Sequence, residues 1–280
     1  MKRRLVTGLA ALGAVSMATP AHAALHTWSL IPYIADPLEH ALGGGVDLDH
    51  LVTFTLVAAL LMLISVRLGA KYRKMLETGD ISPSPKFSLM NVVETIAAAV
   101  KGLLTEVVGP WDDTVDSHGH THKGSKQYFT LCAGFTFAIL FTNLTGLLPY
   151  SSMATANINT TLALALVSFF SYNYFGVKAV GLGNHLKHFM GPVPVMAPLM
   201  VPIEIISHLA RPLSLSLRLF GNMMGDHTVF AVFMVGLGIS IPLVFPVPFL
   251  FLGTLVCVVQ TLVFVLLTMV YISLATASDH

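Results

Sequence analysis

The sequence predicts an all-α protein that crosses a membrane several times. Of its 280 residues, 55% are hydrophobic and only 10% are charged, and the mean hydropathy is +0.77. Apolar runs long enough to span a bilayer recur along the chain. A formal net charge of +1 offers no basic surface for nucleic acid, so we expect no nucleic-acid partner. Cys132 and Cys257 fall in apolar runs and are expected to pack as small hydrophobic side chains.

The amino-terminal segment is typical of a secretory signal peptide. Three basic residues at positions 2–4 precede an apolar run, and an Ala-His-Ala sequence follows at positions 21–23. We predict cleavage after Ala23, so that residues 1–23 are the signal and residues 24–280 form a single membrane domain. An uncleaved short helix is the alternative. Cleavage would leave the mature amino terminus outside the cytoplasmic membrane.

Five segments have the length and apolar character of membrane spans. They cover residues 50–68, 127–148, 158–178, 195–234 and 247–276. The last two exceed the thickness of the hydrocarbon layer, so we expect them to be tilted or to extend beyond the lipid. An odd number of spans after a translocated amino terminus places the carboxyl terminus in the cytoplasm.

The distribution of basic residues supports that orientation. The segment between the first two predicted spans is rich in Lys and Arg, whereas the loops after Pro149 and at residues 236–246 contain neither. Within this basic segment, residues 87–107 repeat apolar side chains at helical spacing, with Glu94 and Lys101 on the opposite side. We predict an amphipathic helix there, lying in the cytoplasmic interface or against the bundle.

Arg218, in the fourth predicted span, is poorly suited to a lipid environment. An arginine side chain stays charged in proteins, and a charge at bilayer depth costs at least about 2.5–3.5 kcal/mol. Such residues usually belong to an ion or substrate path that includes a counter-charge. No carboxylate of this chain is obviously placed at the depth of Arg218, so the counter-charge is expected from a partner.

Other polar side chains of this span share a helical face with Arg218. With about 100 degrees per residue and Glu204 at zero, they fall within about 40 degrees of Glu204. They are His208, Arg211, Arg218, Asn222 and Asp226. At about −60 to −80 degrees lie three small residues, which allow close approach of another helix. These are Ser207, Ser214 and Gly225.

This polar stripe is long enough to cross the membrane. The rise from Glu204 to Asp226 is about 33 Å, close to the thickness of the hydrocarbon layer. We expect Glu204 and His208 on the cytoplasmic side of Arg218 and Asp226 on the outer side. Arg211 lies nearer the cytoplasmic end and has an alternative role, in which it simply extends toward the interface.

Two further polar residues are candidates for the same path. His227 falls at about +140 degrees and is expected to face its own chain, either as a proton relay or as a structural hydrogen-bonding group. Gln260 is the conspicuous polar residue of the last span, and it either lines a polar path or joins two helices by a hydrogen bond to Arg218 or Asn222. Less specific polar lining comes from Asn143, Asn157 and Asn159.

The sequence contains no motif for catalysis or for a cofactor. A His-x-His-x-His run at residues 118–122 could hold a metal, but it lies in a Gly- and Lys-containing loop, and a solvated loop is the favoured interpretation. We find no nucleophile with a base, no phosphate loop and no HExxH pattern. We therefore expect no metal, no cofactor and no covalent reaction catalysed by this chain itself.

The stretch 211–227, with the core SLSLRLFGNM, closely resembles subunit a of the F-type ATP synthase. Glu204 upstream, Gln260, the NLTGLLP sequence at 143–149 and the closing LLTMVYISLATA belong to the same resemblance, which extends from about His26 to the end. It implies a stator subunit in a bacterial inner membrane. Its implied partners are a rotating ring of c-subunits, each with a buried carboxylate, the b-subunit of the peripheral stalk and the remaining synthase subunits.

The resemblance also implies roles for the polar residues. Arg218 would face the ring and separate two aqueous half-channels. Protons would pass from the outer side along Asp226, His227, Asn222 and Gln260 to a ring carboxylate. After nearly a full turn they would leave on the cytoplasmic side. That side carries Glu204 and Ser207, with His208 and Ser214 on the same stripe.

The chain departs from the family pattern at two positions. A small residue is usual where Asp226 stands, and many bacterial members have His or Glu where this chain has Gly253. The outer half-channel is therefore expected to be rewired. An independent channel or secondary transporter, with Arg218 binding an anion, is the alternative function, although the sequence lacks an internal repeat and paired broken helices. A membrane-embedded enzyme has the least support.

Overall fold

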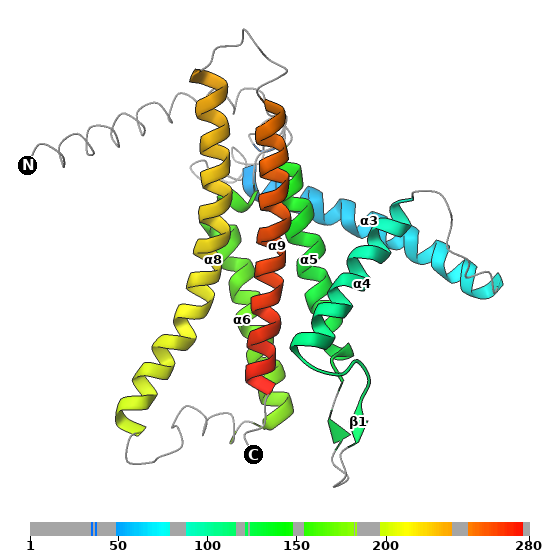
Figure 1. The fold of residues 1–280 in the computed structure, drawn as a ribbon, viewed down its shortest axis with the longest axis vertical. Coiled ribbons are helices and arrows are strands. Elements are labelled where there is room, and N and C mark those ends of the chain that lie inside the picture. The colour runs from blue at the N-terminus through cyan, green and yellow to red at the C-terminus, as the bar shows by residue number, and fades with distance from the viewer. Residues whose placement is uncertain are drawn as a thin grey trace, which may run out of the picture. The chain divides into compact units, whose positions relative to one another are not determined.

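A computed structural model describes the long helical segments of the chain. The described residues are 35, 37, 49–78, 88–115, 121–122, 124–147, 154–181, 183, 197–236 and 246–276. The helices in them are α3 (Asp49–Thr78), α4 (Leu89–Val107), α5 (Lys126–Gly146), α6 (Ile158–Val180), α8 (Ala197–Gly236) and α9 (Pro246–Thr276) (Figure 1). A short 3-10 helix, η1 (Ala154–Ala156), and the antiparallel two-residue strands β1 (Thr114–Val115) and β2 (Thr121–His122) complete them. The predicted all-α polytopic class is confirmed.

Four described helices, α3, α5, α6 and α9, are long and apolar enough to cross a membrane. The fifth predicted span corresponds to α8, which has 40 residues and is not among these four. The polar residues of its stripe lower the mean hydropathy of those α8 segments that are long enough to cross a membrane. The number of five spans therefore stays a prediction, as do the signal peptide at 1–23 and the orientation of both termini, which lie outside the described residues.

Helix α3 extends ten residues beyond the predicted end of the first span, to Thr78. The added turns contain Lys71, Arg73 and Lys74, which are good helix formers but too polar for a span. Hydropathy detects the part of a helix that lipid can cover, and the backbone hydrogen bonds continue past that point. The first span and the first helix thus differ in length for a physical reason.

The predicted amphipathic helix is present as α4. Val100 and Leu104 are buried, whereas Glu94 and Lys101 are exposed on the opposite side, as the spacing predicted. The helix ends at Val107 because Gly109 adopts a φ of +134°, which favours glycine, and Pro110 follows it.

The chain divides into two compact units, to both of which the long helices contribute. The Arg218 unit comprises Met1–Val57, Leu140–Thr161 and Leu217–Gln260, and the Glu204 unit comprises Ala58–Ile139, Leu162–Ser216 and Thr261–His280. In the Arg218 unit, Leu219, Met223 and Cys257 are fully buried.

The Glu204 unit contains ring contacts between helices and the buried hydrogen bonds Ser168–Thr268 and Tyr172–His208. The rings of Tyr128 and Phe175 lie 4.8 Å apart and those of Phe135 and Phe264 lie 5.5 Å apart, both in edge-to-face geometry. Cys132 is fully buried as a free thiol, as is Cys257 in the other unit, and this confirms the prediction for both cysteines.

Candidate functional site

Helix α8 turns one edge of its polar stripe outward and the other toward its own chain. Within the Arg218 unit, Arg218, Gly221 and Gly225 are exposed, and they recur at spacings of three and four residues. A Cβ atom added at either glycine would have no neighbour within 4 Å. We call these three residues the open edge. Ser214, one turn earlier on the same helix, is also exposed.

Arg218 has no acidic partner within the part of the chain that the structure describes. The ion pairs there join Glu204 to His208 and to Arg211, and none involves Arg218. The guanidinium therefore lies on an apolar helix surface with its charge uncompensated by the described residues. Because such a charge is costly at bilayer depth, the open edge is suited to an anionic group from another molecule.

Asn222 and Gln260 join α8 to α9 next to the open edge. The Asn222 amide nitrogen donates a hydrogen bond to the Gln260 side-chain oxygen. Of the two interpretations of Gln260, the hydrogen bond between helices is therefore present. The amide nitrogen of Gln260 is buried and has no hydrogen-bond partner among the described residues, and a buried polar atom of this kind usually binds water. The pair can thus serve as a brace and as a polar lining.

The side chain of Asp226 occupies the space that a residue larger than glycine would need at position 253. A Cβ atom at Gly253, which is buried, would lie 2.8 Å from Oδ2 of Asp226 and 2.7 Å from Cδ2 of Leu147. Real Cβ atoms essentially never approach so closely. The structure therefore brings together Asp226 and Gly253, the two positions at which the sequence is expected to depart from the family pattern: the Asp226 carboxylate of α8 lies where a side chain at position 253 of α9 would begin.

The asparagines predicted as polar lining belong to a buried hydrogen-bonded group in the same unit. Thr155 donates a hydrogen bond of 2.8 Å to Oδ1 of Asn143, and Nδ2 of Asn157 lies 3.2 Å from Nδ1 of His50. Asn143 is fully buried and its amide nitrogen has no protein partner, which makes it a second candidate for bound water. Asn159 is exposed. The sequence analysis did not identify His50.

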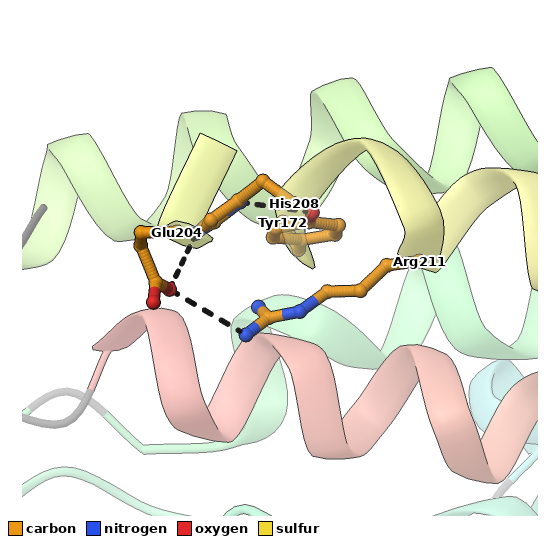
Figure 2. Close-up of polar contacts among 4 residues, drawn as sticks. All are labelled: Tyr172, Glu204, His208 and Arg211. Carbon is orange, nitrogen blue, oxygen red and sulfur yellow. Dashed lines mark hydrogen bonds and ion pairs between the residues drawn. The ribbon is translucent and has the colours of Figure 1, made fainter. Parts of the chain in front are cut away.

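A second polar group lies in the Glu204 unit (Figure 2). Oε1 of Glu204 is 3.5 Å from Nε2 of His208 and 4.0 Å from a terminal nitrogen of Arg211. The Tyr172 hydroxyl of α6 is 3.4 Å from Nδ1 of His208. The Arg211 guanidinium lies over the Tyr271 ring of α9, 5.4 Å from its centroid. Arg211 thus extends to Glu204 and Tyr271.

Sequence periodicity placed Glu204, His208 and Arg211 on one face of α8, and the structure brings these three together. Sequence periodicity did not identify Tyr172 and Tyr271, because a tyrosine in an apolar helix has the pattern of a packing residue. Ser207 is half-buried, and its hydroxyl has no hydrogen-bond partner among the described residues. The side chain of His227 lies outside the described part of the structure.

No group of residues that could hold a metal is present among the described residues. Of the three loop histidines, His118 and His120 lie outside those residues, and His122 is in β2. The polar side chains of the two units described above include carboxylates, amides, hydroxyls, imidazoles and guanidinium groups, all of which can bind water. The carboxylates and imidazoles among them can also exchange protons.

The fold and the site define a class of protein: a multi-pass α-helical membrane protein in which one long helix, α8, carries four charged residues among apolar side chains. Residues 50–273 match the family model described as ATP synthase A chain. The chain belongs to this family, whose functions are ATP synthesis and proton transport in the membrane.

Curated relatives support the same assignment. The ATP synthase subunit a of Bdellovibrio bacteriovorus is 41% identical over 240 residues, which are 85% of this chain and 96% of the relative. ATP synthase subunit a 1 of Syntrophotalea carbinolica is 44% identical over 192 residues, 69% of this chain and 74% of the relative. The Aliarcobacter butzleri protein is 35% identical over 241 residues, 86% and 94% of the two chains. The chain is a multi-pass protein of a bacterial inner membrane.

Proposed function

We propose that this chain is the stator subunit that conducts protons through the membrane sector of an ATP synthase, by two offset half-channels that meet a ring of c-subunits. The observation that carries the proposal is the open edge of α8. Arg218 is exposed there, followed by Gly221 and Gly225 on the same edge, and the described residues supply no acid for it. A ring carboxylate would supply the missing negative charge, and the glycines would let the ring helices approach closely.

The electrostatics of Arg218 account for the coupling of proton flow to rotation. An ionised ring carboxylate is stabilised next to the guanidinium and cannot enter lipid without a large cost. Once protonated, it is neutral and can rotate into the lipid. On its return it loses its proton to the other half-channel, because Arg218 favours the ionised form. A fixed positive charge between the half-channels also opposes the direct passage of protons.

The outer half-channel is assigned to the polar residues of the Arg218 unit. Asn222 and Gln260 are joined by a hydrogen bond beside the open edge, and Asp226 projects toward Gly253. The partnerless amide nitrogen of Gln260 supports a hydrated path at this point. His227, adjacent to Asp226 in sequence, is the proposed relay behind the arginine.

The cytoplasmic half-channel is assigned to Glu204, His208 and Ser207, with Ser214 between them and Arg218 on α8. Glu204 and His208 form a proton-exchanging pair with a separation of 3.5 Å. The mature amino terminus would lie outside and the carboxyl terminus in the cytoplasm. The b-subunit of the peripheral stalk would hold the chain against the ring, and ATP would be made by other subunits of the complex.

The first experiment compares ATP-driven acidification of inverted membrane vesicles that contain wild type or Arg218→Ala, after the amount of assembled complex has been equalised. We expect loss of pumping with the complex intact. Arg73→Ala is the matched control, because Arg73 is an exposed arginine in the polar end of α3, away from the proposed path. Unchanged pumping with Arg218→Ala would contradict the proposal and favour transport by the chain alone, with Arg218 binding an anion.

A further inference from the structure

We infer that Tyr172 is a positioning residue for proton transfer at Glu204: its hydroxyl holds the His208 imidazole where it can exchange a proton with the Glu204 carboxylate. The inference rests on the proposed function, which places Glu204 in the cytoplasmic half-channel. It adds a residue from α6, a helix to which neither the sequence nor the family assignment gives a part in this half-channel.

The geometry places the imidazole between two polar partners. Figure 2 shows His208 with one nitrogen toward Glu204 and the other toward Tyr172. Tyr172 is 1% exposed and His208 is 9% exposed, so bulk water cannot readily replace either contact. A buried hydroxyl and a buried imidazole are each costly without a hydrogen-bonding partner, and each is the partner of the other here.

The hydroxyl suits both directions of a proton transfer because it can donate and accept. When His208 is neutral and Glu204 ionised, Nε2–H points at the carboxylate and Nδ1 accepts a hydrogen bond from the Tyr172 O–H. When His208 carries a second proton, Nδ1–H donates to the Tyr172 oxygen. The imidazolium can then give its Nε2 proton to the Glu204 carboxylate, which yields a neutral pair while Nδ1–H keeps its bond to the tyrosine.

The surroundings keep the Tyr172 ring in place without using its hydroxyl. The ring packs edge to face against Phe169 at 5.4 Å and lies 5.6 Å from the Tyr271 ring. Among the described residues, the charged and titratable groups next to His208 include Glu204 on α8 and Tyr172 on α6. Arg211 of α8 contacts Glu204 and also interacts with the Tyr172 hydroxyl, and Tyr271 of α9 lies beside Arg211 and Tyr172. Because the packing contacts would survive in phenylalanine, Tyr172→Phe isolates the role of the hydroxyl.

The test uses the whole complex in inverted vesicles, where the bathing medium is the cytoplasmic side. ATP-driven acidification is measured against the pH of the medium for wild type, Tyr172→Phe and Tyr174→Phe, normalised to assembled complex. Tyr174 is the matched control, since it is on the same helix but 62% exposed. Loss of one hydrogen bond predicts a fall in rate of about five-fold for Tyr172→Phe, with a shifted pH profile, and no change for Tyr174→Phe.

A second pair of variants separates positioning from packing. His208→Gln keeps a hydrogen-bonding side chain that cannot titrate, so it should also lower the rate, and adding Tyr172→Phe should have no further effect. If Tyr172→Phe behaves like the control, or lowers the rate equally in the His208→Gln background, the inference is wrong. If Tyr172→Phe reduces assembly, His208→Gln alone decides, and an unchanged rate overturns the inference.

Glu204→Gln distinguishes this inference from the proposed function. If Glu204→Gln leaves pumping unchanged, the assignment of the cytoplasmic half-channel fails, and the role of Tyr172 fails with it. If Glu204→Gln lowers pumping while Tyr172→Phe does not, only the role of Tyr172 is overturned.

Discussion

The polar residues of this chain form two clusters, which differ in how far the chain itself provides their partners. In the cluster of the Glu204 unit, both charged side chains have a neighbour of suitable chemistry: Glu204 contacts His208 and Arg211, and Arg211 lies over the Tyr271 ring. In the Arg218 unit, the described residues leave Arg218 without an acid. The first cluster is closed and the second is open.

A proton path in which Arg218 pairs with the carboxylate of a rotating ring requires this difference between the two clusters. A fixed internal acid would compete with the ring carboxylate for Arg218, since two opposite charges a few ångströms apart attract strongly where the dielectric constant is low. In the proposed function no such competition arises at Glu204, because protons there would pass between the chain and water. The degree to which a charged group is paired within the chain therefore distinguishes the proposed coupling site from the proposed half-channel.

The largest expected effect comes from closing the open cluster. Gly221→Asp places a carboxylate three residues from Arg218 on the exposed edge, where an added Cβ meets nothing within 4 Å. We expect ATP-driven acidification to fall about ten-fold or more relative to Gly221→Asn, which has nearly the same size without the charge. Equal rates for the two variants, at equal complex assembly, would show that an internal acid does not compete for Arg218.

An intermediate effect on stability and acidification is expected where the Asp226 side chain of α8 packs against Gly253 of α9. Gly253→Ala places a Cβ 2.8 Å from the Asp226 carboxylate and 2.7 Å from Leu147, so one or both side chains must move. Both contacting atoms are the far ends of flexible side chains, which can shift at low cost, so we expect a loss of stability of about 1 kcal/mol, the low end for overpacking. We also expect slower acidification; thermal dissociation of the purified complex and acidification of vesicles are the two measurements.

The control for Gly253→Ala is Gly102→Ala in α4, where an added Cβ has no neighbour within 4 Å. Adding Asp226→Ala should recover part of the stability but not transport, because it removes the clashing oxygen together with the carboxylate and leaves the contact with Leu147. Recovery of both properties would mean that Asp226 only fills space, and no loss of stability in the single variant would contradict the observed packing.

The smallest effect is expected from a neutral contact in the closed cluster's unit. Ser168 of α6 and Thr268 of α9 are buried and joined by a hydrogen bond of 3.0 Å, and Thr268 also donates to the Phe264 carbonyl. Ser168→Ala should lower stability by about 0.6 kcal/mol, as for other hydrogen bonds between membrane helices, and leave acidification unchanged.

Ser171→Ala is the matched control for Ser168→Ala, because the Ser171 hydroxyl bonds only within its own helix, to the Val167 carbonyl. Thermal dissociation of the complex is the measurement for both variants. A loss of transport from Ser168→Ala as large as that from Gly253→Ala would mean that neutral helix contacts, and not the charged groups, control conduction.

Much of the fold was predictable because hydropathy and periodicity are local. The predicted segments 127–148, 158–178 and 247–276 differ by at most two residues at either end from α5, α6 and α9. The end of α3 was not predictable in this way, since its last turns continue as a polar helix to Thr78. The helical stripe of α8 was also local, and it grouped Glu204, His208 and Arg211, which the structure brings together.

The sequence by itself determined the helices, the class of protein and the residues of α8 that carry charge, since each depends on neighbours within a few turns. Only the tertiary structure decided which of them have partners. The contacts of Tyr172 with His208, and of Asp226 with the space at Gly253, join residues 36 and 27 positions apart. Helical spacing fixes the direction of a side chain about its own axis, but the partner is fixed by how separate helices pack.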